Sequence, residues 1–377
     1  MKEPIRILHV VSSMNLGGIQ SLIMNLYRNI DRNKVQFDFV VHTPEQCVYN
    51  KEILKMGGKI YCVPRFTFQS FFTYITLWET FFNKHPEYQI VHGHIRSTAS
   101  IYLGVAKKHG RFTIAHSHST YVERGAVGFI KRVLEYPLRF IPDDWFSCSK
   151  EAALVLFGPK KALKTKILKN AIDVNKFRYS SEKRVSIRKE LGIEDKFVCG
   201  TVGRIEAPKN PYFIVDIIKE CSLISKDFYF LWVGDGQLID QVKAYATKLR
   251  CNQNISFLGA TQDVPYYLSA MDSFILPSLD EGFGIAAIEA ETIGLPVFVS
   301  DHVPQEVCIA DNCSMIPLKD NAKIWASKIL TNNNLLNENN YCLIMKKGYD
   351  IREQAGAIQS YYQKKNNAQL MKKKEAK

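Results

Sequence analysis

The chain has 377 residues, of which 46% are apolar and 23% are charged, and its formal net charge is +13. This composition excludes a disordered, collagen-like or coiled-coil chain, and the length predicts two globular domains of ~150–200 residues each. No uncharged apolar run reaches the ~18 residues of a membrane-spanning helix, and the N-terminus has no signal-peptide pattern. The basic excess favours an acidic partner, namely nucleic acid, an anionic membrane or a phosphorylated substrate.

The nine cysteines form no C-x-x-C pair, and only Cys308 and Cys313 lie close together in the sequence. We therefore expect neither a disulfide framework nor a structural zinc site, and we interpret most cysteines as small core residues in a reducing cytosol.

Short apolar runs alternate with helical patterns along the first half of the chain. The expected strands are 5–12, 35–42, 59–63, 89–94, 112–116 and 145–148. A looser polar stretch, 170–195, then precedes a second series of expected strands at 197–203, 229–233, 255–258, 273–276 and 296–300. Alternating strands and helices predict an α/β protein with two Rossmann-like, doubly wound parallel-sheet domains that face a central cleft.

The expected domains are residues 1–175 and 176–345. Residues 346–377 are expected to form a C-terminal helix that returns to the first domain and ends in a basic tail.

The densest group of motif residues follows the expected strand at 273–276. Gly282 and Gly284 allow the backbone to approach a ligand, and the N-terminus of the next helix suits a phosphate. Glu281 precedes that helix and Glu289 lies within it, where a carboxylate can accept hydrogen bonds from ribose hydroxyls. The alternative is a glycine turn with two surface glutamates.

A second group follows the expected strand at 197–203, where Arg204 and Lys209 share one loop. Two cations there suit a diphosphate leaving group, and the alternative is a solvated loop with ordinary surface charges. The later Gly234-Asp235-Gly236 is a better signal for a tight turn than for a dinucleotide site.

In the first domain, Gly17 and Gly18 follow the first strand, and two histidine pairs, His92/His94 and His116/His118, follow later strands. The glycines could admit a phosphate or a sugar, or form a simple turn. For the histidines we favour hydrogen bonds to substrate over metal binding, with purely structural roles as the other possibility, because no carboxylate lies at ligand spacing nearby.

These motifs together resemble the GT-B glycosyltransferases of the large retaining class called family four (glycosyl transferases group 1). The resemblance covers nearly the whole chain and is most specific at Pro277-Ser278, Glu281-Gly282-Phe283-Gly284 and Glu289-Ala290, the E-x7-E element. Ala115-His116-Ser117-His118 is similar to members that build bacterial exopolysaccharide and capsule.

The resemblance implies a role for each matching residue. Glu289 would bind the donor ribose, and Glu281 would contact the donor sugar, with Gly282, Phe283 and Gly284 around it. Arg204 and Lys209 would bind the diphosphate, and Gly17 and Gly18 would approach the donor from the first domain. His116, which fits best by register, would contact the sugar, with His118 as the alternative.

The implied reaction moves a sugar from a nucleotide-diphosphate donor, with UDP as the expected nucleotide, to a glycan or lipid-linked glycan with retained configuration. The sequence has no Asp-x-Asp pair, so we expect neither a metal nor a cofactor. The alternatives are a nucleotide-sugar epimerase and a non-catalytic GT-B protein. A nucleic-acid partner is not expected, since no stacking or groove-reading motif is present.

A basic and aromatic stretch in the first domain suits a peripheral contact with anionic lipid on the inner face of the membrane, where a lipid-linked acceptor would be presented. Its alternative is a solvated basic face over core aromatics. The stretch comprises Lys107, Lys108, Arg111, Phe112, Tyr121, Arg124, Phe129, Lys131, Arg132, Tyr136, Arg139 and Phe140. The aromatic segment 66–82 is expected to be a buried helix rather than a membrane insert.

Overall fold

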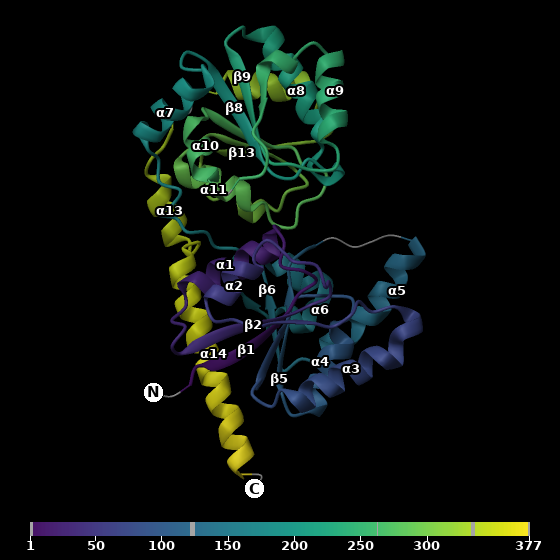
Figure 1. Cartoon of the computed structure of the whole chain (residues 1–377). Helices are drawn as coiled ribbons and strands as arrows, with labels where there is room; N and C mark the ends of the chain where they lie inside the picture. Colours follow the sequence, from purple (N-terminus) through teal and green to yellow (C-terminus); the bar gives the residue numbers. More distant parts are fainter. Residues whose placement is uncertain (1–2, 121–124, 262, 333–335, 376–377) are drawn as a thin grey trace. The chain divides into compact units, whose positions relative to one another are not determined.

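The computed structural model describes residues 3–120, 125–261, 263–332 and 336–375, with side chains to residue 371. Two compact units make up the chain: residues 1–171 with 351–377, and residues 172–350. Each unit holds one parallel sheet, so the expected α/β fold with two doubly wound sheets is confirmed (Figure 1).

The first unit contains a seven-stranded sheet in the order β3-β2-β1-β4-β5-β6-β7. The order reverses direction beside β1, which is the switch point where α/β sheets bind ligands. Its strands are β1 (Ile5–Val10), β2 (Val35–Val41), β3 (Ile60–Cys62), β4 (Ile90–Gly93), β5 (Phe112–Ser117), β6 (Asp144–Ser147) and β7 (Lys166–Ile167). Its helices are α1 (Gly18–Asn29), α2 (Asn50–Lys55), α3 (Phe71–Lys84), α4 (Ala99–Lys108), α5 (Gly125–Glu135), α6 (Lys150–Ala162) and α14 (Ile351–Glu375), with short 3-10 turns η1 (Phe68–Ser70) and η2 (Tyr136–Arg139).

The second unit repeats this order in a six-stranded sheet, β10-β9-β8-β11-β12-β13. The strands are β8 (Phe197–Val202), β9 (Phe228–Val233), β10 (Ile255–Phe257), β11 (Ser273–Leu276), β12 (Val297–Ser300) and β13 (Cys313–Ile316). The helices are α7 (Ser181–Leu191), α8 (Pro211–Ile224), α9 (Ile239–Lys248), α10 (Val264–Ala270), α11 (Ile285–Ile293), α12 (Ala322–Leu330) and α13 (Asn340–Lys346), with η3 (Ala207–Lys209), η4 (Asn252–Asn254) and η5 (Gln305–Val307).

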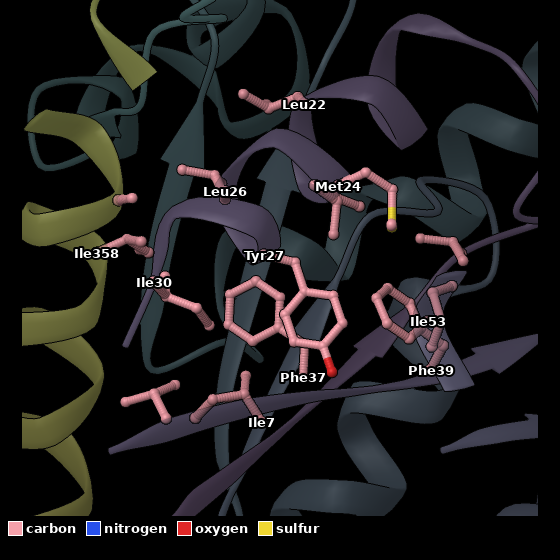
Figure 2. Close-up of a cluster of buried hydrophobic side chains, with 14 of the residues drawn as sticks. Ile7, Leu22, Met24, Leu26, Tyr27, Ile30, Phe37, Phe39, Ile53 and Ile358 are labelled. Carbon is pink, nitrogen blue, oxygen red and sulfur yellow. The ribbon is translucent and has the colours of Figure 1, made fainter. Parts of the chain in front are cut away.

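The core of the first unit continues into the last helix of the chain. Ile7 on β1, Tyr27 on α1 and Ile358 on α14 belong to one buried cluster (Figure 2). Burying a side chain of this size contributes roughly 1.5–3 kcal/mol. Helix α14 also bonds the sheet directly, because the Tyr361 hydroxyl donates to Asp144 at 2.6 Å.

The interpretation of 170–195 as a loose stretch is wrong for its second half, which forms α7. Ser180 caps this helix by accepting from the Lys183 amide, and Gly192 ends it in the left-handed conformation, φ 64°. Only two of its residues are buried, and one of them is Arg188, which is paired with Asp272. An arginine in place of an apolar contact explains why no helical apolar pattern is visible there.

The disulfide expectation is also wrong for one pair, since the structure joins Cys308 to Cys313 with 5.1 Å between the Cα atoms. The expected burial of segment 66–82 holds for only part of it. Trp78 is fully buried, whereas Phe72 is 81% exposed. Among the described residues, no helix has both the length and the hydropathy needed to cross a bilayer.

Candidate functional site

The loop that follows β11 is fixed to its neighbours by backbone hydrogen bonds. The Leu279 amide donates to the Pro208 carbonyl at 2.8 Å, and the Ser300 hydroxyl donates to the Ser278 carbonyl at 2.6 Å. The His302 ring contacts the Leu279 carbonyl at 2.8 Å. The bond to Pro208 holds the loop after β11 against the loop after β8, the two places where the sequence locates its charged motif residues. The other two bonds tie the loop to the end of β12.

Lys209 and Glu281, which are 72 residues apart in the chain, meet at this junction. The Lys209 ammonium forms an ion pair with the Glu281 carboxylate, and the Ser278 hydroxyl donates to the same carboxylate oxygen at 3.3 Å. The two charged side chains are 25% and 12% exposed. A cation and an anion are thus placed side by side at a partly solvated strand end.

Arg204 lies on the same loop as Lys209 but is oriented differently. Its side chain is 67% exposed, and its guanidinium pairs with Glu206 at 3.0 Å. The structure therefore brings Lys209 and Glu281 together and leaves Arg204 at the surface.

Gly234 and Gly236 are required by close packing against the loop after β8. A Cβ atom at Gly234 would lie 1.9 Å from the Gly203 carbonyl oxygen, and one at Gly236 would lie 2.4 Å from the Ile205 carbonyl oxygen. The Ile205 amide donates to the Asp235 carbonyl at 2.9 Å, and this bond fixes the course of the loop that carries Arg204 and Lys209.

Glu289 lies on α11, whose first residue follows Gly284 in the left-handed conformation, φ 87°. Phe283 is buried beside this turn, with its ring 6.2 Å from that of Tyr349, and Gly282 precedes it. Desolvation raises the pKa of the half-buried Glu289 carboxyl to about 8. In the described part of the chain this carboxyl has no hydrogen-bond or ion-pair partner, so its oxygens are available to accept from a ligand.

The glycine pair of the first domain sits at the start of α1. Gly17 occupies the N-cap position and makes no side-chain capping bond, since glycine has none to offer. Gln20 bonds instead to the Ser13 carbonyl, at 3.1 Å. The first amides of α1, beginning with that of Gly18, therefore receive no hydrogen bond from an N-cap side chain.

The two predicted histidine pairs belong to a larger cluster of five buried histidines. His9 lies on β1 opposite His92 of β4, and β5 is the next strand of the sheet. Hydrogen bonds join the rings: His9 Nδ1 to His94 Nε2 at 2.9 Å, His94 Nδ1 to His118 Nε2 at 2.9 Å, and His92 Nε2 to His116 Nδ1 at 3.2 Å.

Burial lowers the pKa of all five rings, and that of His118 to about 3. The cluster is therefore neutral near pH 7. His116 is 2% exposed and His118 is 8% exposed, so His118 is the more accessible of the two rings considered for the sugar. Two triads of these histidines, His9/His92/His94 and His94/His116/His118, could each hold a metal ion.

Three further residues were not identified from the sequence. His9 sits inside an apolar strand, where a single histidine gives no motif signal. Tyr362 of α14 contacts His92 Nδ1 with its hydroxyl at 2.6 Å, across 270 residues. Glu291 is fully buried and accepts from the Ile309 and Ala310 amides at 3.0 and 2.8 Å, and burial raises the pKa of its carboxyl to about 8.

Helix α5 and turn η2 expose large apolar side chains. Within α5, Gly128 is the one residue described as buried, whereas Phe129 and Val133 are 62% and 57% exposed. Tyr136 and Phe140 are exposed in the next turn. Of the other members of the expected basic stretch, Arg111 is a correction, because it is buried and donates to the Phe82 carbonyl at 3.1 Å. Tyr121 and Arg124 lie outside the described residues.

The sequence is similar to a family of glycosyltransferases and to individual members of bacterial origin. Residues 183–347 match the family model described as glycosyl transferases group 1. The chain is 27% identical over 372 residues to the putative glycosyltransferase EpsF of Bacillus subtilis, covering 95% of this chain and 96% of that protein. It is 30% identical over 246 residues to an Escherichia coli UDP-Gal:alpha-D-GlcNAc-diphosphoundecaprenol alpha-1,3-galactosyltransferase, covering 61% of this chain and 62% of that protein.

Among solved structures, Anabaena Alr3699/HepE in complex with UDP is similar with a TM-score of 0.73 at 17% identity, covering 99% of this chain and 100% of that one. Sucrose-phosphate synthase of Thermosynechococcus elongatus is similar with a TM-score of 0.76 at 16% identity, covering 96% and 99%. The chain therefore has the GT-B fold, and residues 183–347 of its second domain are similar to the glycosyl transferases group 1.

Proposed function

We propose that the protein is a retaining glycosyltransferase that moves a sugar from a UDP-sugar to a glycan or lipid-linked glycan during bacterial surface-polysaccharide synthesis. The observation that carries the proposal is the second-domain strand end, where Lys209 and Glu281 meet and Glu289 keeps an unpartnered carboxyl on α11. A cation, a carboxylate and a helix N-terminus are the groups that a nucleotide-diphosphate sugar requires. The names of relatives that use UDP-Gal or bind UDP support the same donor class.

Each residue would act on a different part of the donor. The Glu289 carboxylate accepts from the ribose hydroxyls, and Lys209 with Arg204 neutralises the charge that grows on the diphosphate as the glycosidic bond breaks. Glu281, with Gly282, Phe283 and Gly284, lies beside the sugar. The transition state resembles an oxocarbenium ion, and the leaving phosphate takes the proton of the acceptor hydroxyl.

Lys209 is already oriented before the donor arrives, because Glu281 holds its ammonium. The diphosphate then competes with Glu281 for the lysine, and the cation needs little reorganisation at the moment of transfer. This charge, together with the N-terminus of α11, takes the place that a divalent ion holds in metal-dependent transferases. We therefore propose that the reaction needs no metal ion and no cofactor.

In the first domain, His118 is the better candidate for the sugar contact because it is the more exposed of the two rings. His116 would then stand behind it, and Gly17 and Gly18 would approach the donor with backbone amides. The neutral state of both rings suits hydrogen bonds to sugar hydroxyls rather than to phosphate.

A direct test measures nucleotide release from a panel of UDP-, GDP- and ADP-sugars, with and without a lipid-linked glycan, in the presence of EDTA. We expect UDP release that depends on the acceptor and survives EDTA. Formation of a new nucleotide sugar without acceptor would identify an epimerase. Absence of turnover with every donor would favour a non-catalytic GT-B protein.

We further propose that α5 and η2 dock on the anionic inner face of the membrane, where a lipid-linked acceptor is found. Exposed Phe129, Tyr136 and Phe140 lie among Lys131, Arg132 and Arg139, and α4 packs against both α5 and the aromatic helix α3 (Figure 1). An amphipathic helix of this kind lies in the lipid interface.

Phe129→Glu tests this docking, with Leu163→Glu as its control, since Leu163 is 90% exposed on another helix end of the same domain. Co-sedimentation with vesicles that contain anionic lipid should fall for Phe129→Glu and not for Leu163→Glu. Wild-type binding should also weaken as salt rises above physiological strength, where the Debye length is ~8 Å. Equal loss in both variants, or no binding at any salt, would contradict the proposal.

A further inference from the structure

The five buried histidines form a polar cluster from which the proposed transfer uses only His116 and His118. In each of the two triads, one ligand atom from every residue lies within 4.8 Å of the others. Imidazole is a common protein ligand for first-row transition ions. The cluster thus has the side chains and the spacing for an ion that the transfer chemistry does not require.

The triad His94/His116/His118 is the better of the two. In the other triad, His92 already uses both ring nitrogens, one on the Tyr362 hydroxyl and one on His116. In the chosen triad the contact between His94 Nδ1 and His118 Nε2 is internal, and at 2.9 Å the two nitrogens share a single proton. An ion between them would replace that proton.

His116 supplies an independent observation. Its Nδ1 contacts His92 at 3.2 Å, while its Nε2 is buried with no hydrogen-bond partner among the described residues. A buried ring nitrogen without a partner costs free energy, and an ion would satisfy it. His118, which is 8% exposed, lies nearest to solvent and offers a path of entry.

Two rings of the triad are held by hydrogen bonds through their second nitrogen. A ligating histidine normally bonds a further group through its second ring nitrogen, which fixes the ring. His94 Nε2 contacts His9 Nδ1 at 2.9 Å, and His116 Nδ1 contacts His92, which in turn contacts Tyr362.

We propose that His94, His116 and His118 bind one divalent transition ion of the Zn²⁺ class, with a fourth position open to water. Zinc–nitrogen bonds of about 2.0–2.1 Å in tetrahedral geometry place two ligand nitrogens about 3.3 Å apart. The His94–His118 contact therefore needs to open by only a few tenths of an ångström. In the proposed function His118 contacts the donor sugar, so ion and donor would compete; that consequence rests on the proposed function, whereas ion binding does not.

The test titrates Co²⁺ into the full-length, metal-stripped protein without donor and follows the visible ligand-field absorption of tetrahedral cobalt, then displaces it with Zn²⁺. We expect one saturable equivalent of Co²⁺ that Zn²⁺ displaces. The exposed cysteines Cys62 and Cys342 are replaced by serine in a parallel variant, because thiolates also bind both ions. Binding that vanishes in this cysteine variant would overturn the proposal.

His116→Gln and His118→Gln remove one ligand each, and His109→Gln is the matched control outside the cluster. We expect at least ~100-fold weaker Co²⁺ binding in both ligand variants, the upper end of the effect of losing an outer-shell partner, and wild-type binding in the control. Circular dichroism checks folding, and the partly accessible His118 provides the test if His116→Gln does not fold. Unchanged binding in His118→Gln, or no saturable binding in the wild type, would overturn the proposal. Because no donor is present, either failure leaves the glycosyl-transfer proposal untouched.

Discussion

The two domains of this chain share a strand order but place different chemistry at the carboxyl ends of their strands. In the second domain, Lys209 and Glu281 are charged, partly exposed and supplied by two loops that dock on each other. In the first domain, five histidines from β1, β4, β5 and the residues just after them are neutral, buried and bonded mainly to one another.

Under the proposed function, the difference follows from the ligand that each site would bind. A diphosphate brings charge, so its partners must be charged and must remain solvated until it arrives. A sugar hydroxyl or a transition ion needs fixed neutral nitrogens, which burial and mutual hydrogen bonds provide. The same α/β framework thus supports an electrostatic site in one domain and a preorganised neutral site in the other.

Lys209→Ala removes a positive charge from the second-domain site and should produce the largest effect. Removing one preorganised charge partner typically costs ~10²–10³ in rate, so turnover at saturating donor should fall by that factor. The melting temperature should change little, because partly exposed ion pairs contribute little stability. Lys196→Ala is the control, since Lys196 forms an exposed pair with Asp227 in the same domain. Near wild-type turnover in Lys209→Ala would remove this residue from the mechanism.

The pH dependence of nucleotide binding tests the role of Glu289 in the same second-domain site. The pKa of Glu289 is raised to about 8, so the carboxyl is largely protonated below that pH, whereas ribose hydroxyls donate best to its ionised form. Affinity for UDP should therefore rise with pH, by up to about tenfold per pH unit below 8, and level off above it. Glu289→Gln should bind UDP with no such dependence between pH 6 and 9. The same pH slope in both proteins would assign it to another group.

Arg204→Ala should have a smaller effect than Lys209→Ala. The Arg204 side chain is 67% exposed and is paired with Glu206, so water screens its charge. We expect a loss of turnover of no more than about tenfold, measured at saturating donor. A loss equal to that of Lys209→Ala would show that the two cations act as one clamp.

Tyr362→Phe tests the neutral histidine cluster of the first domain and should have the smallest effect. The variant leaves buried His92 Nδ1 without its 2.6 Å partner, which costs about 1–3 kcal/mol. Urea unfolding should show this loss, and Ser360→Ala, an exposed position on the same helix, should not. Unchanged stability in Tyr362→Phe would mean that this hydrogen bond contributes nothing to the cluster.

The sequence predicts which residues lie together at the second-domain strand ends better than it does for the first domain, because of how each group is assembled. Gly282, Gly284, Glu281 and Glu289 lie within nine residues, so their spacing is visible as a motif. The histidine cluster is assembled by sheet order: His9 meets His92 only because β1 and β4 are neighbours, and Tyr362 arrives from the last helix. No local pattern carries that information.

Other failures have local physical causes. Helix α7 has no apolar pattern in the sequence because Arg188 replaces an apolar residue on its inner face; its local signals are the capping residues Ser180 and Gly192. Arg111 belongs to the expected basic stretch, yet its guanidinium donates to backbone carbonyls inside the first unit. The Cys308–Cys313 bond closes a short loop in which the Ile309 and Ala310 amides donate to Glu291. This contact depends on tertiary structure, so no local sequence pattern indicates it.

The central claim is that the second domain holds the nucleotide through Glu289. Calorimetric titration of UDP into the full-length protein tests it most directly, at about pH 8.5, where the Glu289 carboxyl is ionised. Hydrogen bonds to a charged group contribute roughly 1.5–3 kcal/mol each, so Glu289→Ala should bind UDP at least ~10-fold more weakly. Glu220→Ala, on α8 in the same domain, should bind like the wild type. The same dissociation constant for Glu289→Ala and the wild type would contradict the account.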